Sequence, residues 1–179
     1  MKSLIDPADI TFVDTVVTYL KMETPPAEKL PPMEGVSFRL WPKPIDVESY
    51  RRVYYGVGKE HHWVDRLVMP EEEVSALIND EKIDIYVMEV GGETAGYCEF
   101  IKEKAFTEIL YFGLLPAFIG KGLGKYFLRR AIEHAWSYGV QWIQLNTCGL
   151  DHPHALNNYK RNGFVEVRQE VHSRRKVKG

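Results

Sequence analysis

The sequence predicts an α/β (α+β) protein in which a mixed central β-sheet carries helices on both faces. Three observations support this fold class: strand-like runs alternate with amphipathic helical segments, a glycine turn joins two consecutive strands, and one strand leads through a glycine-rich turn into the best-defined helix. With 179 residues and 45% hydrophobic content, the chain is long enough for one sizeable core and too short for two large ones. We therefore expect a single domain over residues 1–179.

Local patterns predict each element in turn. Alternating or β-branched apolar residues indicate strands, and apolar residues three to four positions apart indicate helices. Asp46 can cap a first helix, Pro70 begins a second one with an acidic first turn, and Gly139 supplies a left-handed stop for the third. An extra N-terminal strand and a proline-rich connection, within residues 1–33, precede the core. We expect strands over residues 15–22, 36–41, 83–90, 94–101, 107–115, 142–147 and 165–171, and helices from 46, over 71–79, over 123–139 and from 153.

Composition disfavours several classes of partner. Twenty-three basic against 25 acidic residues give a formal charge of −2, so no overall field attracts nucleic acid or an anionic membrane. The basic end, residues 174–178, is expected to be a solvated tail rather than a nucleic-acid arm, because no aromatic residues interleave it. Nowhere do 18 apolar residues run together, and the start, residues 1–7, lacks a sustained apolar run. A cytoplasmic location is the expectation.

The cysteines and histidines show no metal-binding or redox spacing. Cys98 and Cys148 lie in apolar, strand-like runs, where buried free thiols are expected. His152 and His154 flank a proline at a predicted helix start, with Asp151 or His152 as the N-cap. We therefore expect no metal, and a Cys148 nucleophile beside His152 is the less favoured alternative.

A glycine-rich turn, residues 120–125, follows the strand at 107–115 and opens the best-defined helix. Glycines at alternate positions remove Cβ atoms where N–H groups approach a ligand, and a helix start adds unpaired N–H groups and a positive dipole end. A phosphorylated cofactor is the expected occupant. Tyr126 stands where a P-loop needs Ser or Thr, which disfavours ATP. The Gly-x-Gly-x-Gly spacing, followed by Gln144 and Asn146 in the next strand, disfavours NAD.

Two stretches resemble motifs of the GNAT acetyltransferases. The glycine turn resembles motif A, Arg/Gln-x-x-Gly-x-Gly/Ala, with Ile119 at the position of the Arg or Gln. A second stretch resembles motif B, in which Asn-x-x-Ala precedes Tyr and then x-x-x-Gly-Phe, with His152 at the position of the Asn. The resemblance extends over residues 84–170 and implies the GNAT fold and acetyl-CoA (coenzyme A) as the cofactor. The residues that match the two motifs are Gly122, Gly124, Ala155, Tyr159, Gly163 and Phe164.

The resemblance also implies where the cofactor lies. In GNAT proteins two adjacent parallel strands splay apart and the pantetheine of acyl-CoA lies in the gap; here these would be the strands that end at Leu115 and Thr147. Main-chain groups of Leu114 and Leu115 would then hydrogen-bond the pantetheine like an added strand. The cofactor-binding residues expected from the resemblance are Leu114, Leu115, Ile119, Gly120, Lys121, Gly122, Leu123, Gly124, Lys125, Asn146, His152, Ala155 and Tyr159.

The reaction that the resemblance implies is direct attack of a primary amine on the thioester of acetyl-CoA. A lysine-like amine is mostly protonated at neutral pH, so a carboxylate must remove its proton. The resemblance points to Glu108 as this base, with Glu99 on the neighbouring strand as the alternative. Tyr159 stands where the family's general acid protonates the leaving thiolate, and backbone N–H groups near Leu114 can hold the oxyanion. The alternatives are glutamates that face solvent and a tyrosine that only packs.

The acceptor of the acetyl group is expected over the early helices and the loop between them. Tyr54, Trp63, Asp65 and Arg66 place aromatic rings and charges there, which suits a cationic amine, although the same residues could clamp the opening strand. A small-molecule amine and a peptide or protein amine both stay open. Two alternatives to an N-acetyltransferase are a non-catalytic acyl-CoA-binding module and a GNAT-fold transferase with another acyl donor. Many proteins of this fold form homodimers, so a homodimer also stays open.

Overall fold

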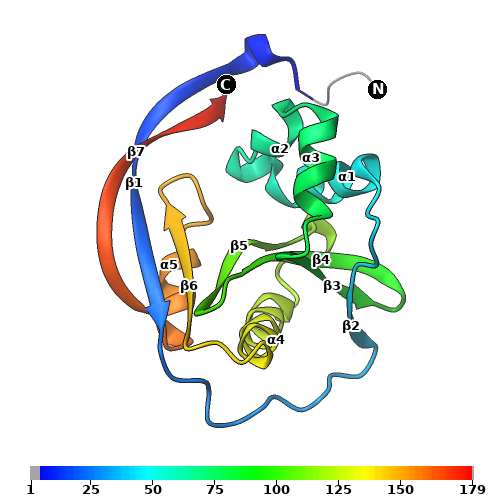
Figure 1. The fold of residues 1–179 in the computed structure, drawn as a ribbon, viewed down its shortest axis with the longest axis vertical. Coiled ribbons are helices and arrows are strands. Elements are labelled where there is room, and N and C mark those ends of the chain that lie inside the picture. The colour runs from blue at the N-terminus through cyan, green and yellow to red at the C-terminus, as the bar shows by residue number, and fades with distance from the viewer. Residues whose placement is uncertain (1–4, 179) are drawn as a thin grey trace.

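The computed structural model describes residues 5–178, so residues 1–4 of the chain start and residue 179 lie outside the description. The seven strands of this described part form one sheet in the order β2-β3-β4-β5-β6-β1-β7 (Figure 1). The strands are β1 (Ile10–Met22), β2 (Val36–Leu40), β3 (Ile83–Val90), β4 (Glu93–Lys102), β5 (Phe106–Leu114), β6 (Trp142–Cys148) and β7 (Val165–Val177). The helices are α1 (Val47–Gly58), α2 (Asp65–Val68), α3 (Glu71–Ile78), α4 (Leu123–Ser137) and α5 (Ala155–Arg161), with 3₁₀ turns η1 (Pro7–Asp9), η2 (Lys59–His61) and η3 (Pro116–Phe118).

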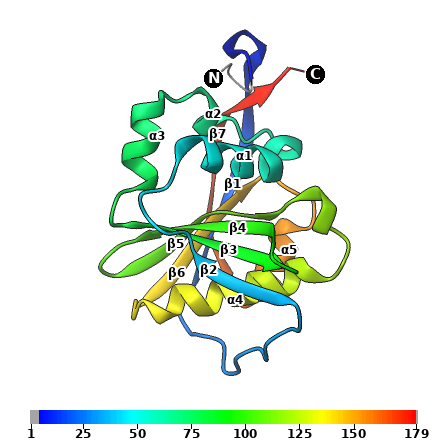
Figure 2. The ribbon, with the colours of Figure 1, turned by 90° about the vertical axis from the view of Figure 1, so that its right-hand side faces the viewer.

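The mixed sheet lies between two helical layers, as the fold class predicts. Figure 2 shows α1, α2 and α3 above strands β2 to β5 and α4 below them. Each layer encloses its own apolar cluster, because alternate residues of a strand point to opposite faces. On the α4 face the cluster includes Phe100, Phe127 and Ile143, and on the α1 face it includes Tyr50 and Tyr97; all five are fully buried.

Several local predictions are confirmed. The Asp46 carboxylate accepts the Ser49 N–H at 2.8 Å and caps α1, and Gly139 follows α4 with a φ of 74°. Two details differ. The short helix α2 has no counterpart in the sequence prediction, and α5 begins at Ala155 with His154 at the N-cap position instead of Asp151 or His152.

The N-terminal strand β1 lies inside the sheet rather than beside it. It pairs antiparallel with β6 from Val17↔Cys148 to Met22↔Ile143, and antiparallel with β7 from Ile10↔Val177 to Lys21↔Val165. Val17 and Leu20 are buried as a consequence. The expectation of a solvated basic tail at residues 174–178 is therefore wrong for most of this segment, because β7 continues to Val177 and its end pairs with the start of β1.

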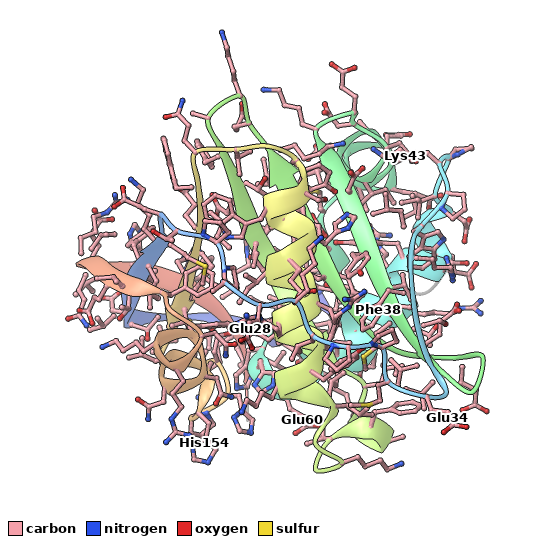
Figure 3. All side chains as sticks on the ribbon, turned by 90° about the horizontal axis from the view of Figure 1, so that it is seen from below. Glu28, Glu34, Phe38, Lys43, Glu60 and His154 are labelled. Atoms are coloured by element: carbon pink, nitrogen blue, oxygen red, sulfur yellow. The ribbon has the colours of Figure 1, made fainter. Side chains whose placement is uncertain are left out.

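The proline-rich connection between β1 and β2 crosses the outer side of α4. Figure 3 shows the segment that carries Glu28 passing over this helix on its way to Phe38. The Leu30 N–H donates to Glu133 Oε1 at 2.8 Å, and the Tyr126 hydroxyl donates to the Pro31 carbonyl at 3.1 Å and accepts the Met33 N–H at 3.0 Å. These contacts hold an irregular segment, whose prolines lack N–H donors, against the helix.

Candidate active site

The parallel strands β5 and β6 separate after four paired positions. Their pairing runs from Phe106↔Trp142 to Ile109↔Leu145, while β5 continues to Leu114 and β6 to Cys148. The separation that the resemblance implies is thus present in the backbone. It opens a cavity of about 520 Å³ that extends from the glycine turn to the loop after α1.

Twelve of the predicted site residues line this cavity, and seven do not. From the cofactor side and the acceptor side together, the lining includes Tyr54, Trp63, Asp65, Leu114, Ile119, Gly120, Gly124, Lys125, Asn146, His152, Ala155 and Tyr159. The predicted residues outside the lining are Arg66, Glu99, Glu108, Leu115, Lys121, Gly122 and Leu123.

The glycine turn presents backbone donors at one end of the cavity. Gly120 and Gly122 have φ angles of 80° and 77°, which only glycine adopts without strain, and Gly122 is the N-cap of α4. No side chain caps this helix, so its first N–H groups point outward without an intrahelical partner. A Cβ added at Gly124 would meet only Leu114 Cδ1, at 3.7 Å, so the space in front of this backbone is open. This arrangement fits the pyrophosphate of coenzyme A.

The two flanking side chains of the turn differ in what they offer. Ile119 is 53% exposed and lines the cavity as an apolar residue, as its departure from motif A implies. Lys125 also lines the cavity, whereas the Lys121 ammonium lies 5.3 Å from the centre of the Phe118 ring. Of the two lysines, Lys125 is therefore the one positioned to neutralise a bound phosphate.

The backbone of β5 supplies free groups at Leu114 but not at Leu115. The Leu115 N–H donates to the Ala95 carbonyl at 2.8 Å, so the prediction that this group is free of sheet pairing is wrong. Because successive residues of a strand direct their backbone groups to opposite sides, those of Leu114 and Phe112 point away from β4 and into the gap. An extended ligand can pair with this edge.

Tyr159 belongs to α5 and lines the cavity. Its ring packs edge-on against Phe164, with the ring centres 6.1 Å apart, and the side chain is half-buried in the lining. Burial raises the pKa of the Tyr159 hydroxyl well above its usual value, and the nearby Asp151 charge adds to this effect. The phenol is therefore protonated at neutral pH and can donate a proton.

Glu99 is a buried structural residue and not a base open to solvent or substrate. Its carboxylate is 0% exposed; Oε2 accepts the Tyr50 hydroxyl at 2.7 Å, and Oε1 accepts from Arg66 Nη2 at 3.1 Å. Arg66 is itself 7% exposed, so its predicted role on the substrate side is also corrected. Burial acts to lower the pKa of Arg66, but the Glu99 carboxylate together with Tyr111 and Tyr50 raises it above its usual value, so the guanidinium is charged. Together they fix α2 to the sheet beneath the cavity.

Glu108 lies on the face of β5 that also carries Tyr111, but it does not line the cavity. Its cross-strand partner Ile101 packs in the cluster under α1, which places Glu108 on the same face as Tyr111. Gln144 Nε2 donates to Glu108 Oε2 at 3.0 Å, and among the described residues no hydrogen bond reaches Oε1. One oxygen of the Glu108 carboxylate, Oε1, therefore remains free to accept a hydrogen bond.

The acceptor end of the cavity is an aromatic wall with carboxylates at its rim. The Tyr54, Trp63 and Tyr111 rings contact one another, with centre separations of 4.9 to 5.9 Å. Trp63 Nε1 donates to Asp151 Oδ1 at 3.4 Å, while Asp151 Oδ2 accepts from Thr147 Oγ1 and from the Cys148 N–H.

Sequence reasoning missed several residues that line this end. Tyr111 lies among the apolar residues of β5, where the pattern predicts only a strand, and the spacing before Pro153 predicts Asp151 as a helix cap. Arg174 and Arg175 belong to the segment that the sequence predicts to be a solvated tail. The signal that could have placed the two arginines is Val177, which continues the strand pattern after them.

The cysteine and histidine side chains of the site form neither a reactive thiol nor a metal-binding cluster among residues 5–178. Burial raises the pKa of the Cys148 thiol, and Asp151 adds to the effect, so this side chain is protonated and a poor nucleophile at neutral pH. His61 and His152 lie with ring centres 6.1 Å apart at the cavity mouth, and Figure 3 labels the adjacent Glu60 and His154 at this end of the molecule. Among residues 5–178, no cluster of three or more His, Cys, Asp or Glu side chains could hold a metal ion.

Comparison with known proteins gives the family. The profile of the Acetyltransferase (GNAT) family matches residues 45–164, and the chain belongs to this family. An uncharacterized N-acetyltransferase from Methanocaldococcus jannaschii is 27% identical over 125 residues, which cover 66% of this chain and 51% of that protein. The chain thus spans about half the length of this curated relative.

Solved structures confirm the GNAT fold. A GCN5-related N-acetyltransferase from Sphaerobacter thermophilus superposes with a TM-score of 0.65 at 18% identity, covering 91% of this chain and 51% of that one. The ribosomal-protein-S18-alanine N-acetyltransferase from Escherichia coli superposes with a TM-score of 0.59 at 15% identity, covering 74% and 79%. In the part of this chain that the structure describes, no helix is long and apolar enough to cross a membrane.

Proposed function

We propose that this protein is an N-acetyltransferase that transfers an acetyl group from acetyl-CoA to a primary amine by direct attack within a ternary complex. The observation that carries the proposal is the continuity of the cavity. It joins the open backbone donors of the glycine turn, the free edge of β5, the Tyr159 hydroxyl and the aromatic acceptor end in one space. Membership of the GNAT family supports the same reaction class.

The proposed roles in cofactor binding follow from the geometry. The N–H groups at the start of α4 and the Lys125 ammonium would hold the pyrophosphate, and Leu114 would pair with the pantetheine. Acetyl-CoA supplies the activated thioester. Backbone N–H groups near Leu114 would then stabilise the negative oxygen that forms on attack.

Two side chains are proposed to move protons. Glu108 would accept the proton of the amine through a water molecule, because it faces the acceptor side of β5 and keeps Oε1 open. Tyr159 would donate its proton to the sulfur of the departing coenzyme A, since its raised pKa keeps the phenol protonated. After the reaction, Glu108 would release the amine proton to solvent and Tyr159 would take up a proton from solvent, which restores both side chains.

The test is release of free coenzyme A thiol from acetyl-CoA in the presence of a panel of primary amines. We expect amine-dependent thiol release that Glu108→Gln lowers by a factor of about 100 or more, in line with loss of a general base. The matched control is Glu103→Gln, the same change at the turn between β4 and β5, where Glu103 pairs with Lys82 outside the cavity. Binding of acetyl-CoA without turnover by any amine would support the alternative of a non-catalytic acyl-CoA-binding module.

Two further expectations from the sequence stay predictions. A cytoplasmic location would be checked by fractionating the source cells, and a homodimer by light scattering on the eluted protein. Acetyl-CoA as donor rather than a longer acyl-CoA is part of the same proposal, and competition between the two donors in the thiol assay decides it.

A further inference from the structure

The two arginines at the acceptor end, Arg174 and Arg175, differ in their contacts. Arg175 is engaged, because its Nη1 donates to Asp65 Oδ1 at 2.6 Å and its guanidinium lies 5.7 Å from the centre of the Phe12 ring. Asp151 is also engaged, through the Thr147 hydroxyl, the Cys148 N–H and the Trp63 indole. These contacts involve Asp65 Oδ1, both oxygens of Asp151 and the Arg175 guanidinium, and none of them involves Arg174.

Arg174 is the one of these two arginines that has no such partner in the described part of the chain. It is half-buried and lines the cavity, and among residues 5–178 no hydrogen bond or ion pair reaches its guanidinium. Its Nε is fully buried without an acceptor. Its charge lies near the Cys148 thiol, whose pKa it acts to lower against the larger effect of burial. A half-buried guanidinium without a hydrogen-bond acceptor is unfavourable, so a ligand with anionic oxygens would stabilise it.

The backbone fixes Arg174 at this position. It belongs to β7 and pairs with Val13 of β1, and β1 in turn pairs with β6 at Val17↔Cys148. The guanidinium is thus carried by a strand that is anchored through β1 to the wall of the cavity. An anchored cation is better suited to recognise a ligand than one on a mobile tail.

We propose that Arg174 binds an anionic group of the acceptor, a carboxylate or a phosphate, so that the natural substrate is an amine that also carries an anion. This inference rests on the proposed function. The amine would lie against Tyr111 and Trp63, and the anion would lie toward β7. Asp65 already holds Arg175 and Asp151 accepts hydrogen bonds through both of its oxygens, whereas the Arg174 guanidinium is free to pair with the anion of an amino acid or an aminosugar phosphate.

The test compares acceptors that differ only in the anion. L-amino acids are assayed against their carboxamides, and glucosamine 6-phosphate against glucosamine, with spermidine as a polycation, in the thiol-release assay. We expect the anionic member of at least one pair to exceed its neutral partner at least tenfold in kcat/KM. Which pair responds distinguishes a carboxylate from a phosphate.

Substitution of Arg174 then tests whether this residue causes the preference for the anionic acceptor. Arg174→Gln is expected to lower kcat/KM at least tenfold for the anionic acceptor and less than threefold for its neutral partner, with Arg174→Lys partly restoring activity. Arg168→Gln is the matched control, because Arg168 lies on the same strand over the Tyr19 ring and outside the cavity. Thermal unfolding of each variant checks that the fold is retained.

The outcomes separate this inference from the proposed function. Neutral acceptors or spermidine used as well as anionic ones, or equal losses for both in Arg174→Gln, would overturn the inference and leave the acetyltransferase intact. Acetylation of neutral amines but of no anionic amine would also overturn it. Absence of turnover with every amine, whether or not acetyl-CoA binds, would instead overturn the proposed function.

Discussion

Tyr159 is the residue whose proposed role has the most specific support. Its side chain lines the same cavity as the residues of the cofactor side and the acceptor side, and among residues 5–178 no hydrogen bond engages its hydroxyl. Burial favours the neutral phenol, so the proton remains available over the physiological pH range.

Replacing Tyr159 by Phe should lower kcat by a factor of about 100, since a general acid contributes that much or more. The KM for acetyl-CoA should change little, because the ring and its packing on Phe164 are kept. Tyr19→Phe, which removes a hydroxyl that contacts His172 outside the cavity, serves as control. An unchanged kcat in Tyr159→Phe would show that the hydroxyl donates no proton in the slow step.

The direction of the pKa shift gives a pH prediction for the same residue. A raised pKa means that Tyr159 loses its proton only above the ordinary tyrosine range, so the acid form persists to high pH. The kcat profile should therefore show no falling limb up to about pH 10. A steady-state titration from pH 6 to pH 10 measures this, and a decline centred near pH 8 or 9 would contradict the assignment.

The Arg66–Glu99 pair illustrates why two site predictions failed. In sequence, Glu99 is a single charge in an apolar strand and Arg66 follows another charged residue, Asp65, and nothing there shows that Glu99 and Arg66 meet. Glu99→Gln should lower the free energy of unfolding by about 3–5 kcal/mol, because it leaves the buried Arg66 charge unpaired. Urea unfolding measures this, with Glu103→Gln at the exposed pair with Lys82 as a control that should change little. A small loss in Glu99→Gln would mean that Arg66 finds another partner or solvent.

At the scale of elements, the turn from β5 into α4 is the proposed binding site of the cofactor pyrophosphate. Gly124 is the sensitive position, since it lines the cavity in the first turn of α4 and an added Cβ would contact only Leu114. The protein itself can accommodate the methyl group, and helix propensity favours it.

Gly124→Ala should therefore separate stability from binding. We expect the free energy of unfolding to stay the same or rise by up to about 1 kcal/mol. The Kd for acetyl-CoA should rise at least tenfold, about 1.4 kcal/mol. Ser137→Ala at the other end of α4 is the control, because its hydroxyl bonds only the helix backbone at His134. Unchanged affinity in Gly124→Ala would place the pyrophosphate elsewhere.

The elements that were predictable are those whose signals are local. The Asp46 cap, the Gly91–Gly92 hairpin turn and the periodic apolar face of α4 are each encoded within a few residues, and each is present. The position of β1 between β6 and β7 was not predictable, because strand pairing across more than 100 residues leaves no local mark. The length of β7 was not predictable for a related reason. Charged side chains are as compatible with a strand that exposes one face to solvent as they are with a solvated tail.

At the scale of the whole molecule, β1 lies between β7 and β6 and so connects the last strand of the chain to a strand of the cavity wall. Since β1 pairs on both sides, residues 17–22 should exchange their amide hydrogens as slowly as their β6 partners, residues 143–148. The connection over α4, residues 24–33, should exchange faster because few of its backbone groups are paired. Hydrogen exchange followed by mass spectrometry measures all three segments. Rapid exchange in residues 17–22 would mean that β1 docks on a core that is already complete without it.

The measurement that tests the central claim most directly is isothermal titration of the protein with acetyl-CoA, with ATP and NADH titrated in the same buffer. The account predicts saturable heat with acetyl-CoA and none with the other two nucleotides, because the uncapped start of α4 leads into an extended gap along β5 and not into a dinucleotide or triphosphate site. No heat with acetyl-CoA, or equal binding of ATP or NADH, would contradict the cofactor assignment and reduce residues 120–124 to a structural turn.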